Sequence, residues 1–257
     1  MKRVVTALIL IPVFVYLVLW SPYWVFLAAV AAVGLLCFLE YSGMVALHST
    51  QPPGMFGYAA GLLVLLLPGN SIAFLILIAL LALALGLRSR ELSDTLPFAA
   101  CLVFGVLYVF GALRAGVELR GRSVYWLLFA LSLNWVGDIA ALYVGKALGR
   151  HKLSPRISPG KTWEGAIGSM LAAIVYGALY FPKLLPAVPI AQGLAIAAVG
   201  NVAGQIGDLA ESAMKRGAGV KDSGTLLPGH GGWLDRLDSS LFALPVVYFL
   251  LINLGVQ

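Results

Sequence analysis

Charged side chains are scarce in this sequence. Only 11% of its 257 residues are Asp, Glu, Lys or Arg, and 61% are hydrophobic, whereas a soluble domain carries roughly a quarter charged residues. Residues 41–87, 184–207 and 239–257 contain no charged residue at all. Each stretch can cross a bilayer, which takes about 20 residues. The scarcity of charge argues against a soluble globular protein and predicts an integral membrane protein.

Cysteine is rare as well, with two copies in the chain. Cys37 and Cys101 lie in apolar segments, so neither a disulfide framework nor a zinc site is expected. The basic N-terminus resembles a signal peptide. However, its apolar run is longer than usual, and no clear small-x-small cleavage site precedes Pro22. We interpret this run as a retained first span.

Hydropathy predicts an all-α, polytopic membrane protein with about nine transmembrane helices in a single membrane domain, residues 1–257. The helices of residues 1–110 are expected to be mainly structural, because their three acidic residues avoid the middle of a span. Seven of the eleven acidic residues follow from Asp138 onward, so the active site is expected within residues 124–255. The predicted spans are 4–20, 23–40, 55–69, 71–87, 97–113, 124–144, 163–181, 184–210 and 239–255.

The distribution of basic residues predicts the orientation. With a cytoplasmic N-terminus, 13 of the 17 Lys and Arg residues fall inside, in agreement with the positive-inside rule. The segment 114–123 works against this count, because it places three arginines outside. The two most polar loops, 145–162 and 211–238, lie two spans apart and therefore face the same side. We expect that side to be the cytoplasm.

The predicted eighth span has one polar face. Such a face cannot meet lipid, so it lines a cavity or contacts polar partners on neighbouring helices. Asp208 either pairs with a basic residue to fix helix packing or, with Glu211 nearby, shares a cation. In the sixth span, Asp138 is likewise either part of a site or a structural counter-ion. The polar face of the eighth span consists of Asn201, Gln205, Asp208, Ser212 and Lys215, at helical spacing.

The loop 145–162 is strongly basic. Basic residues beside a membrane often bind anionic headgroups and set the topology. The stretch "SPGKTWEG" suggests more, because it places Ser158, Lys161 and Thr162 at the start of the seventh span. A helix N-terminus with a lysine and hydroxyl groups is suited to bind phosphate.

The loop 211–238 is rich in glycine, with six copies between Gly217 and Gly232. Glycines let a backbone approach a ligand closely and present its N–H groups. Carboxylates without cysteine and with a single histidine suit Mg²⁺ better than zinc. For Asp238 the alternative is an N-cap of the ninth span. The charged side chains of this loop that could serve phosphate or metal are Lys215, Arg216, Lys221, Asp222, Asp235 and Asp238.

Residues 212–238, "SAMKRGAGVKDSGTLLPGHGGWLDRLD", closely resemble the signature of the phosphatidate cytidylyltransferases, also called CDP-diacylglycerol synthases. Residues 137–165 resemble the second polar block of that family, and the N-terminal half matches only in its multi-span character. Trp233 departs from the aliphatic residue or phenylalanine expected there. The matching signature positions are Ser212, Lys215, Arg216, Lys221, Asp222, Gly224, Leu227, Pro228, His230, Gly231, Gly232, Asp235, Arg236, Leu237 and Asp238.

The resemblance implies an enzyme that converts CTP and phosphatidate into CDP-diacylglycerol and pyrophosphate, with Mg²⁺ or another divalent cation. It implies that Asp208 and Asp235 hold the metal. The implied catalytic set is Asp208, Asp235, Lys215, Arg216, Lys221 and Arg236. The implied substrate-binding set is Lys161, Ser158, Thr162, Asn201, Gln205, Ser212, Asp222, His230, Gly231, Gly232, Asp238 and Asp138.

The expected partners are CTP, phosphatidate and membrane lipids, with no nucleic acid, and a homodimer is allowed. The expected location is the bacterial inner membrane, with the active site facing the cytoplasm. Two alternatives stay open. One is a related membrane transferase, such as a polyprenol kinase or a CTP-dependent enzyme that acts on an ether lipid. The other is a transporter, but transporters often show related halves, whereas the polar residues here gather in one half.

The orientation can be tested by cysteine labelling. We replace Ser154 or Ser223 with cysteine in a background without Cys37 and Cys101. Both sites are expected to react only from the cytoplasmic side, because the basic loops stay inside. Reaction with a membrane-impermeant reagent outside intact cells would reverse the assigned orientation.

Overall fold

The computed structural model describes residues 12–48, 50–67, 72–89, 91–227, 229 and 231–255. Over these ranges the chain is mostly helical, and its one sheet is a two-stranded hairpin. The prediction of an all-α, polytopic membrane protein is confirmed, whereas the count of nine spans stays a prediction. Five helical segments are long and apolar enough to cross a membrane: α2 (Tyr23–Leu47), the run Leu92–Arg122, α7 (Val124–Leu148), α8 (Trp163–Leu184) and α9 (Ile190–Gly217).

Several helices extend beyond the predicted spans. Helix α2 continues past residue 40 to Leu47, and α10 (Leu234–Asn253) begins before residue 239. The segment predicted as a loop from residue 114 is helical to Arg122, because Val117 and Leu119 bury their side chains there. The run Leu92–Arg122 consists of η1 (Leu92–Asp94), α5 (Thr95–Gly105), the π-helix η2 (Val106–Gly111) and α6 (Ala112–Arg122).

The chain divides into two compact units, and the first contains residues 21–114 and 214–236. Its core contains a cluster of aromatic rings. The ring of Phe38 on α2 lies 5.0 Å from that of Tyr58 on α3 (Gly54–Leu66) and 5.4 Å from that of Phe110 on η2. Gly61 on α3 lies directly against the Phe110 ring. A glycine at this point lets the two helical segments approach closely.

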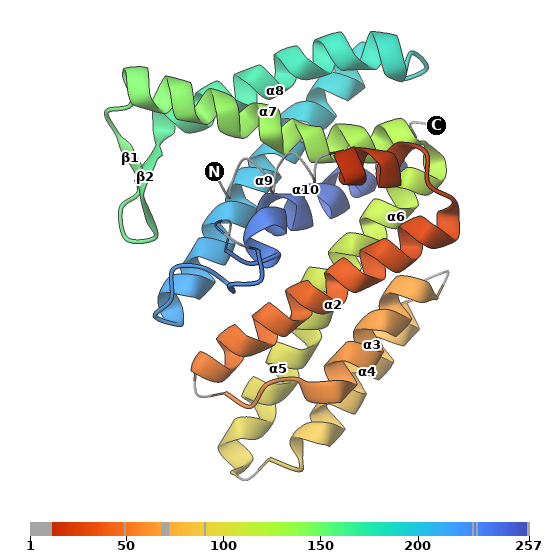
Figure 1. The fold of residues 1–257 in the computed structure, drawn as a ribbon, viewed down its shortest axis with the longest axis vertical. Helices are drawn as coiled ribbons and strands as arrows, with labels where there is room; N and C mark the ends of the chain where they lie inside the picture. The colour runs from red at the N-terminus through yellow and green to blue at the C-terminus, as the bar shows by residue number, and fades with distance from the viewer. Residues whose placement is uncertain are drawn as a thin grey trace. The chain divides into compact units, whose positions relative to one another are not determined.

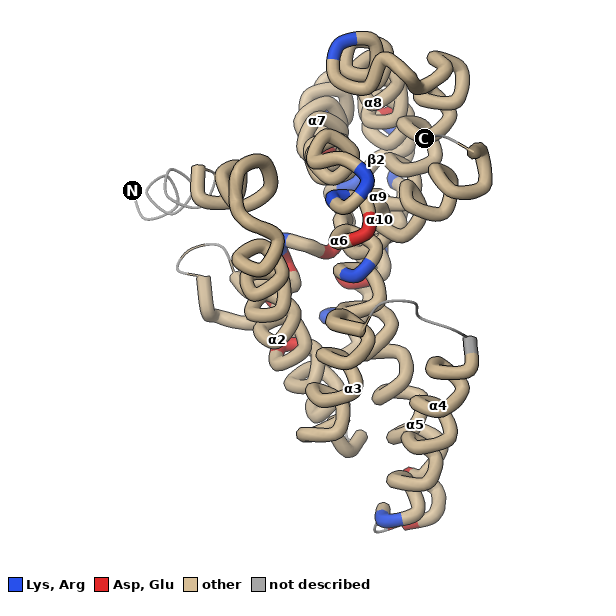
Figure 2. Tube along the Cα trace, turned by 90° about the vertical axis from the view of Figure 1, so that its right-hand side faces the viewer, with Lys and Arg blue, Asp and Glu red and all other residues tan. Residues whose placement is uncertain are grey.

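Helices α3 and α4 (Ile72–Gly86) carry no charged residue, and Figure 2 shows the described parts of both in tan. On α4, Leu77 and Leu80 expose more than half of their side-chain surface. Such a surface is unfavourable in water and favourable in hydrocarbon. We therefore infer that these leucines face lipid.

The second unit contains residues 115–213 and 237–257. Helices α7 and α8 pack along each other, and the hairpin of β1 (Lys152–Ser154) and β2 (Ser158–Thr162) projects from their ends (Figure 1). The hairpin leads directly into α8. There the Thr162 hydroxyl caps the helix by accepting a hydrogen bond from the Gly165 N–H at 3.2 Å. The position of the basic hairpin is therefore set by the start of α8.

The contact between Gly61 and Phe110 predicts a stability difference between two glycine substitutions. Gly61→Ala should destabilise the protein by about 1–3 kcal/mol, because a Cβ atom there overlaps the Phe110 ring. Gly43→Ala is the control, since a Cβ atom on α2 at that position meets nothing within 4 Å. The measurement is SDS-induced unfolding of purified protein in detergent. Equal stability of the two variants would contradict this account of the core.

Candidate active site

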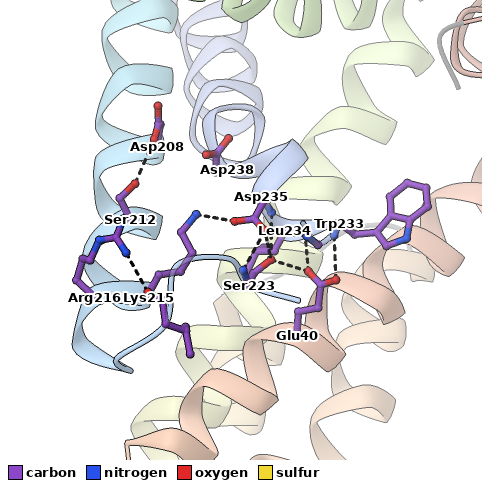
Figure 3. A network of polar contacts seen from close by, with 12 residues as sticks. Glu40, Asp208, Ser212, Lys215, Arg216, Ser223, Trp233, Leu234, Asp235 and Asp238 are labelled. Atoms are coloured by element: carbon purple, nitrogen blue, oxygen red, sulfur yellow. Dashed lines mark hydrogen bonds and ion pairs between the residues drawn. The ribbon is translucent and has the colours of Figure 1, made fainter. Parts of the chain in front are cut away.

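The glycine-rich loop is organised around a group of polar contacts in the first unit. We call it the loop cluster, and it consists of Glu40, Lys215, Ser223, Gly232 and Asp235. The Lys215 ammonium lies 2.5 Å from Asp235 Oδ1, and both side chains are at most 10% exposed. The other oxygen, Asp235 Oδ2, accepts hydrogen bonds from the backbone N–H groups of Ser223 at 2.9 Å and Gly232 at 2.8 Å (Figure 3).

These contacts keep Asp235 in its charged form. Burial by itself raises the pKa of its carboxyl, but the hydrogen bond from Lys215 and the backbone hydrogen bonds from Gly232 and Ser223 outweigh burial and lower it. Both carboxylate oxygens therefore accept hydrogen bonds from the protein itself. In this arrangement Asp235 holds the loop together.

Glu40 of α2 is a member of the loop cluster that the sequence interpretation missed. Its carboxylate accepts hydrogen bonds from the backbone N–H groups of Trp233 at 2.9 Å and Leu234 at 2.8 Å, and from the Ser223 hydroxyl at 2.8 Å. The first N–H groups of a helix have no partner within that helix. Glu40 thus supplies acceptors at the start of α10 from a helix almost two hundred residues away in sequence.

A signal for Glu40 was present in the sequence. It is the only acidic residue before residue 91, and an acidic residue alone in an apolar region is a functional candidate by default. The predicted span ended at residue 40, which placed Glu40 at a membrane edge. Because α2 continues to Leu47, Glu40 lies within the helix and is 5% exposed.

The alternative interpretation of Asp238 as an N-cap is wrong. Helix α10 begins at Leu234, so Asp238 lies within the helix and Asp235 in its first turn. The Asp238 carboxylate accepts a hydrogen bond from the N–H of the next residue, Ser239, at 2.7 Å. The cause of the error is tertiary, because the cap at this helix start comes from Glu40.

The second unit holds a separate group, the helix cluster, which we define as Asp138, Lys161, Asp208 and Ser212. Lys161 Nζ lies 2.6 Å from Asp208 Oδ2, and the Ser212 hydroxyl donates a hydrogen bond to Asp208 Oδ1 at 3.3 Å. Asp138 on α7 is close enough for its charge to interact with those of Asp208 and Lys161. The structure thus brings together four predicted substrate-binding or catalytic residues from α7, β2 and α9.

Two further members of the polar stripe on α9, Asn201 and Gln205, bond to α8. Asn201 Oδ1 accepts a hydrogen bond from Gln205 at 2.7 Å. The Ser169 hydroxyl lies 3.2 Å from Asn201 Oδ1 and 3.1 Å from Asn201 Nδ2, which donates to it. Gln205 also donates to the Ala166 carbonyl at 3.1 Å. Of the two alternatives for this face, polar partners on a neighbouring helix are therefore confirmed at these residues. Their role in admitting a lipid headgroup stays a prediction.

The remaining predicted residues lie around these clusters. Arg216 donates a hydrogen bond to the Val220 carbonyl at 3.2 Å and is otherwise exposed. Gly231 has a φ of 79°, which glycine adopts without strain. His230 and Pro228 lie outside the described residues. Three further predicted residues, Lys221, Asp222 and Arg236, are exposed to solvent, and Ser158 is half-buried on β2.

A divalent cation fits the donor set of the helix cluster. Mg²⁺ commonly binds one or two carboxylates together with substrate phosphate oxygens, and Asp138 and Asp208 are two carboxylates with interacting charges. Among the described residues, no group of three or more His, Cys, Asp or Glu side chains is arranged to hold a metal. A closed zinc site is therefore not found there. Asp208 and Asp235 belong to different units, so their shared metal stays a prediction.

Comparison with known proteins identifies the family. The model of the cytidylyltransferase family matches residues 1–254, and the chain belongs to this family. A phosphatidate cytidylyltransferase of Brucella suis biovar 1 is 38% identical, with 96% of this chain and 91% of the relative covered. The corresponding proteins of Staphylococcus aureus strain COL and Bacillus subtilis strain 168 are 34% and 33% identical, with 98% and 97% of both chains covered.

The buried ion pair of the loop cluster predicts a strong energetic coupling. Lys215→Met should destabilise the protein by about 3–5 kcal/mol, because it leaves the Asp235 charge buried without its partner. Lys215→Met combined with Asp235→Asn should cost less than the sum of the single changes, by about 1–3 kcal/mol. The measurement is a double-mutant cycle by SDS unfolding.

The exposed pair of His151 and Glu164 provides the control cycle, since the His151 side chain is 78% exposed. Its coupling is expected to be much weaker than that of the buried pair, because solvent screens the two charges. Additive effects at Lys215 and Asp235 would show that the buried pair contributes no specific stability.

Proposed function

We propose that this protein transfers the cytidylyl group of CTP to phosphatidate and so forms CDP-diacylglycerol and pyrophosphate. The match along nearly the whole chain to relatives named phosphatidate cytidylyltransferase carries this proposal. The structure supports it, because the signature residues 212–238 cover the end of α9, the glycine-rich loop and the start of α10, so that polar side chains gather next to two apolar helices. Such a loop brings phosphate-binding groups to the place where a water-soluble nucleotide meets a lipid.

The reaction needs charge neutralisation more than proton transfer. A phosphate oxygen of phosphatidate attacks the α-phosphorus of CTP and forms the new P–O bond. The bond between the α-phosphorus and the bridging oxygen breaks, and pyrophosphate leaves with its electrons. The attacking oxygen is already anionic, so no strong general base is required. The enzyme then accelerates the reaction by bringing two anions together and by stabilising the charge that develops.

The basic residues divide the work. Arg216, Lys221 and Arg236 are exposed, and they bind the phosphates of the substrates directly. Lys215 is buried against Asp235, so it first holds the loop in shape and adds positive charge beneath it. Lys161 on β2 belongs to the helix cluster, where it forms an ion pair with Asp208. It lies two residues before the first residue of α8, Trp163.

A divalent cation, expected to be Mg²⁺, takes part when bound. Asp208 is its proposed ligand in the helix cluster, with Asp138 as the neighbouring carboxylate. The prediction of Asp235 as a further ligand is retained as part of this proposal. Such a cation lowers the negative charge of the triphosphate and polarises its phosphoryl oxygens. Lys161 pairs with Asp208 Oδ2 and would compete with such a cation for that oxygen.

The protein is integral to the membrane, and the relatives are bacterial. We propose that both polar loops face the cytoplasm, because CTP is found there and because the basic residues are concentrated in these loops. Phosphatidate reaches the loops from the bilayer, with its acyl chains in the lipid. A homodimer stays a prediction.

The activity is tested with purified protein in lipid nanodiscs that contain phosphatidate. CTP should yield CDP-diacylglycerol and an equal amount of pyrophosphate, whereas ATP should not replace it. Diacylglycerol and polyprenol acceptors separate this activity from that of a lipid kinase. Transfer of a γ-phosphate to either acceptor, without pyrophosphate release, would refute the proposed reaction.

The metal proposal predicts a specific effect of Asp208→Asn. Chelation with EDTA should abolish turnover, and Mg²⁺ should restore it. Asp208→Asn should lower kcat/KM by about 100-fold and raise the Mg²⁺ concentration needed for half-maximal activity, because the metal loses a charged ligand. Glu91→Gln, on an exposed segment, is the charge-matched control. An unchanged Mg²⁺ requirement in Asp208→Asn would remove Asp208 from the metal site.

A further inference from the structure

We propose that Glu40, which lies outside the signature, is the positioning residue for two parts of the glycine-rich loop, residues 221–224 and 231–235. The inference deepens the proposed function and rests on it, since the loop supplies the phosphate-binding residues. The hydrogen bonds of Glu40 go to Ser223, Trp233 and Leu234, and not to the basic residues assigned to phosphate. Glu40 acts through the backbone of the loop and through Ser223 (Figure 3).

Glu40 and Asp235 meet at one hydroxyl group. Ser223 Oγ lies 2.8 Å from Glu40 Oε2 and 3.0 Å from Asp235 Oδ2. A hydroxyl has a single proton to donate, so the two carboxylates share it. Their mutual repulsion is offset by five other donors, which are the Lys215 ammonium and the N–H groups of Ser223, Gly232, Trp233 and Leu234. The loop backbone is thus folded around two negative charges.

Two positions of the loop require glycine because Glu40 lies against them. A Cβ atom built on Gly224 would come within 2.7 Å of Glu40 Oε1, and one on Gly232 would overlap both Glu40 Oε2 and the Ser223 hydroxyl. Side chains at these positions would push the carboxylate away from its donors. The sequence interpretation assigned the glycines to a ligand. The structure shows that at least these two make room for Glu40.

This geometry sets the position of the phosphate-binding residues. Lys221 precedes Ser223 by two residues and Arg236 follows Asp235 directly, so each lies within two residues of a member of the Glu40 network. When Glu40 holds Ser223 and the start of α10, both basic side chains leave the backbone from defined points. Loss of Glu40 should therefore weaken the binding of CTP while the helices themselves remain folded.

The test is Glu40→Gln, which keeps the size of the side chain and replaces one acceptor oxygen by an NH₂ donor. Hydrogen exchange of the amides in residues 231–235 should accelerate about tenfold or more, as expected for the loss of a hydrogen bond to a charged group. The KM for CTP should rise about tenfold, with kcat affected less. Exchange is measured in nanodiscs without substrate, and kinetics with CTP and phosphatidate.

Two further variants sharpen the test. Ser223→Ala removes the shared hydroxyl, and its effect on the KM for CTP should not add to that of Glu40→Gln, because both disrupt one network. Ser42→Ala is the matched control, a buried polar residue on the same helix. It should leave both the exchange of residues 231–235 and the KM for CTP unchanged.

The outcomes separate the inference from the proposed function. Wild-type exchange and wild-type KM in Glu40→Gln would overturn the positioning role. A lower kcat together with a smaller yield of folded protein, at an unchanged KM, would also overturn it, since that pattern indicates support of the fold alone. If the wild-type protein forms no CDP-diacylglycerol, the proposed function fails. The exchange measurement then still decides whether Glu40 holds the loop.

Discussion

The burial of negative charge in an apolar protein is the constraint on which this structure depends. A carboxylate away from water is stable only when hydrogen-bond donors or positive charges surround it. Glu40 and Asp235 meet this requirement together, with an ammonium, a hydroxyl and several backbone N–H groups. The hydrogen bonds to the two carboxylates therefore form only when the loop folds. An apolar membrane chain obtains a defined polar segment in this way.

The helix cluster solves the same problem differently. Asp208 lies on α9 and meets a lysine that arrives from the β hairpin. The hairpin needs few residues to reach it, because Thr162 ends the strand and caps α8 at the same point. A short extramembrane element thus carries a positive charge to an acidic helix face. This pair is only partly buried, in contrast to the pair of Lys215 and Asp235.

The two clusters suggest how a membrane-embedded transferase can use few charged residues. Most of the helices provide apolar surface and aromatic packing, such as that of Phe38 and Phe110. In the proposed function the charged residues of the loop serve two purposes: the buried pair of Lys215 and Asp235 shapes the loop, and the exposed Lys221 and Arg236 bind phosphate. Division of these tasks explains why loss of a buried charge and loss of an exposed one should have different kinetic effects.

The amino-acid sequence by itself determined the membrane class, the helical content and the family. These properties depend on composition, on apolar runs long enough to span a bilayer, and on a dense local signature, all of which are readable along the chain. It also placed Asp208 and Ser212 on one helix face, because helical spacing is a local property. The loop expected from residue 114 was wrong, because Arg114 can lie in a helix once its apolar neighbours are buried.

Only the tertiary structure decided which acceptor caps α10 and why the loop contains its glycines. Glu40 and Leu234 are far apart in sequence, and no local pattern connects a helix near the N-terminus with the start of the last helix. The partner of Lys161 was equally open, since several acidic residues were available. In each case the choice rests on the close approach of segments distant in the chain, which brings Glu40 to its donors and Lys161 to Asp208.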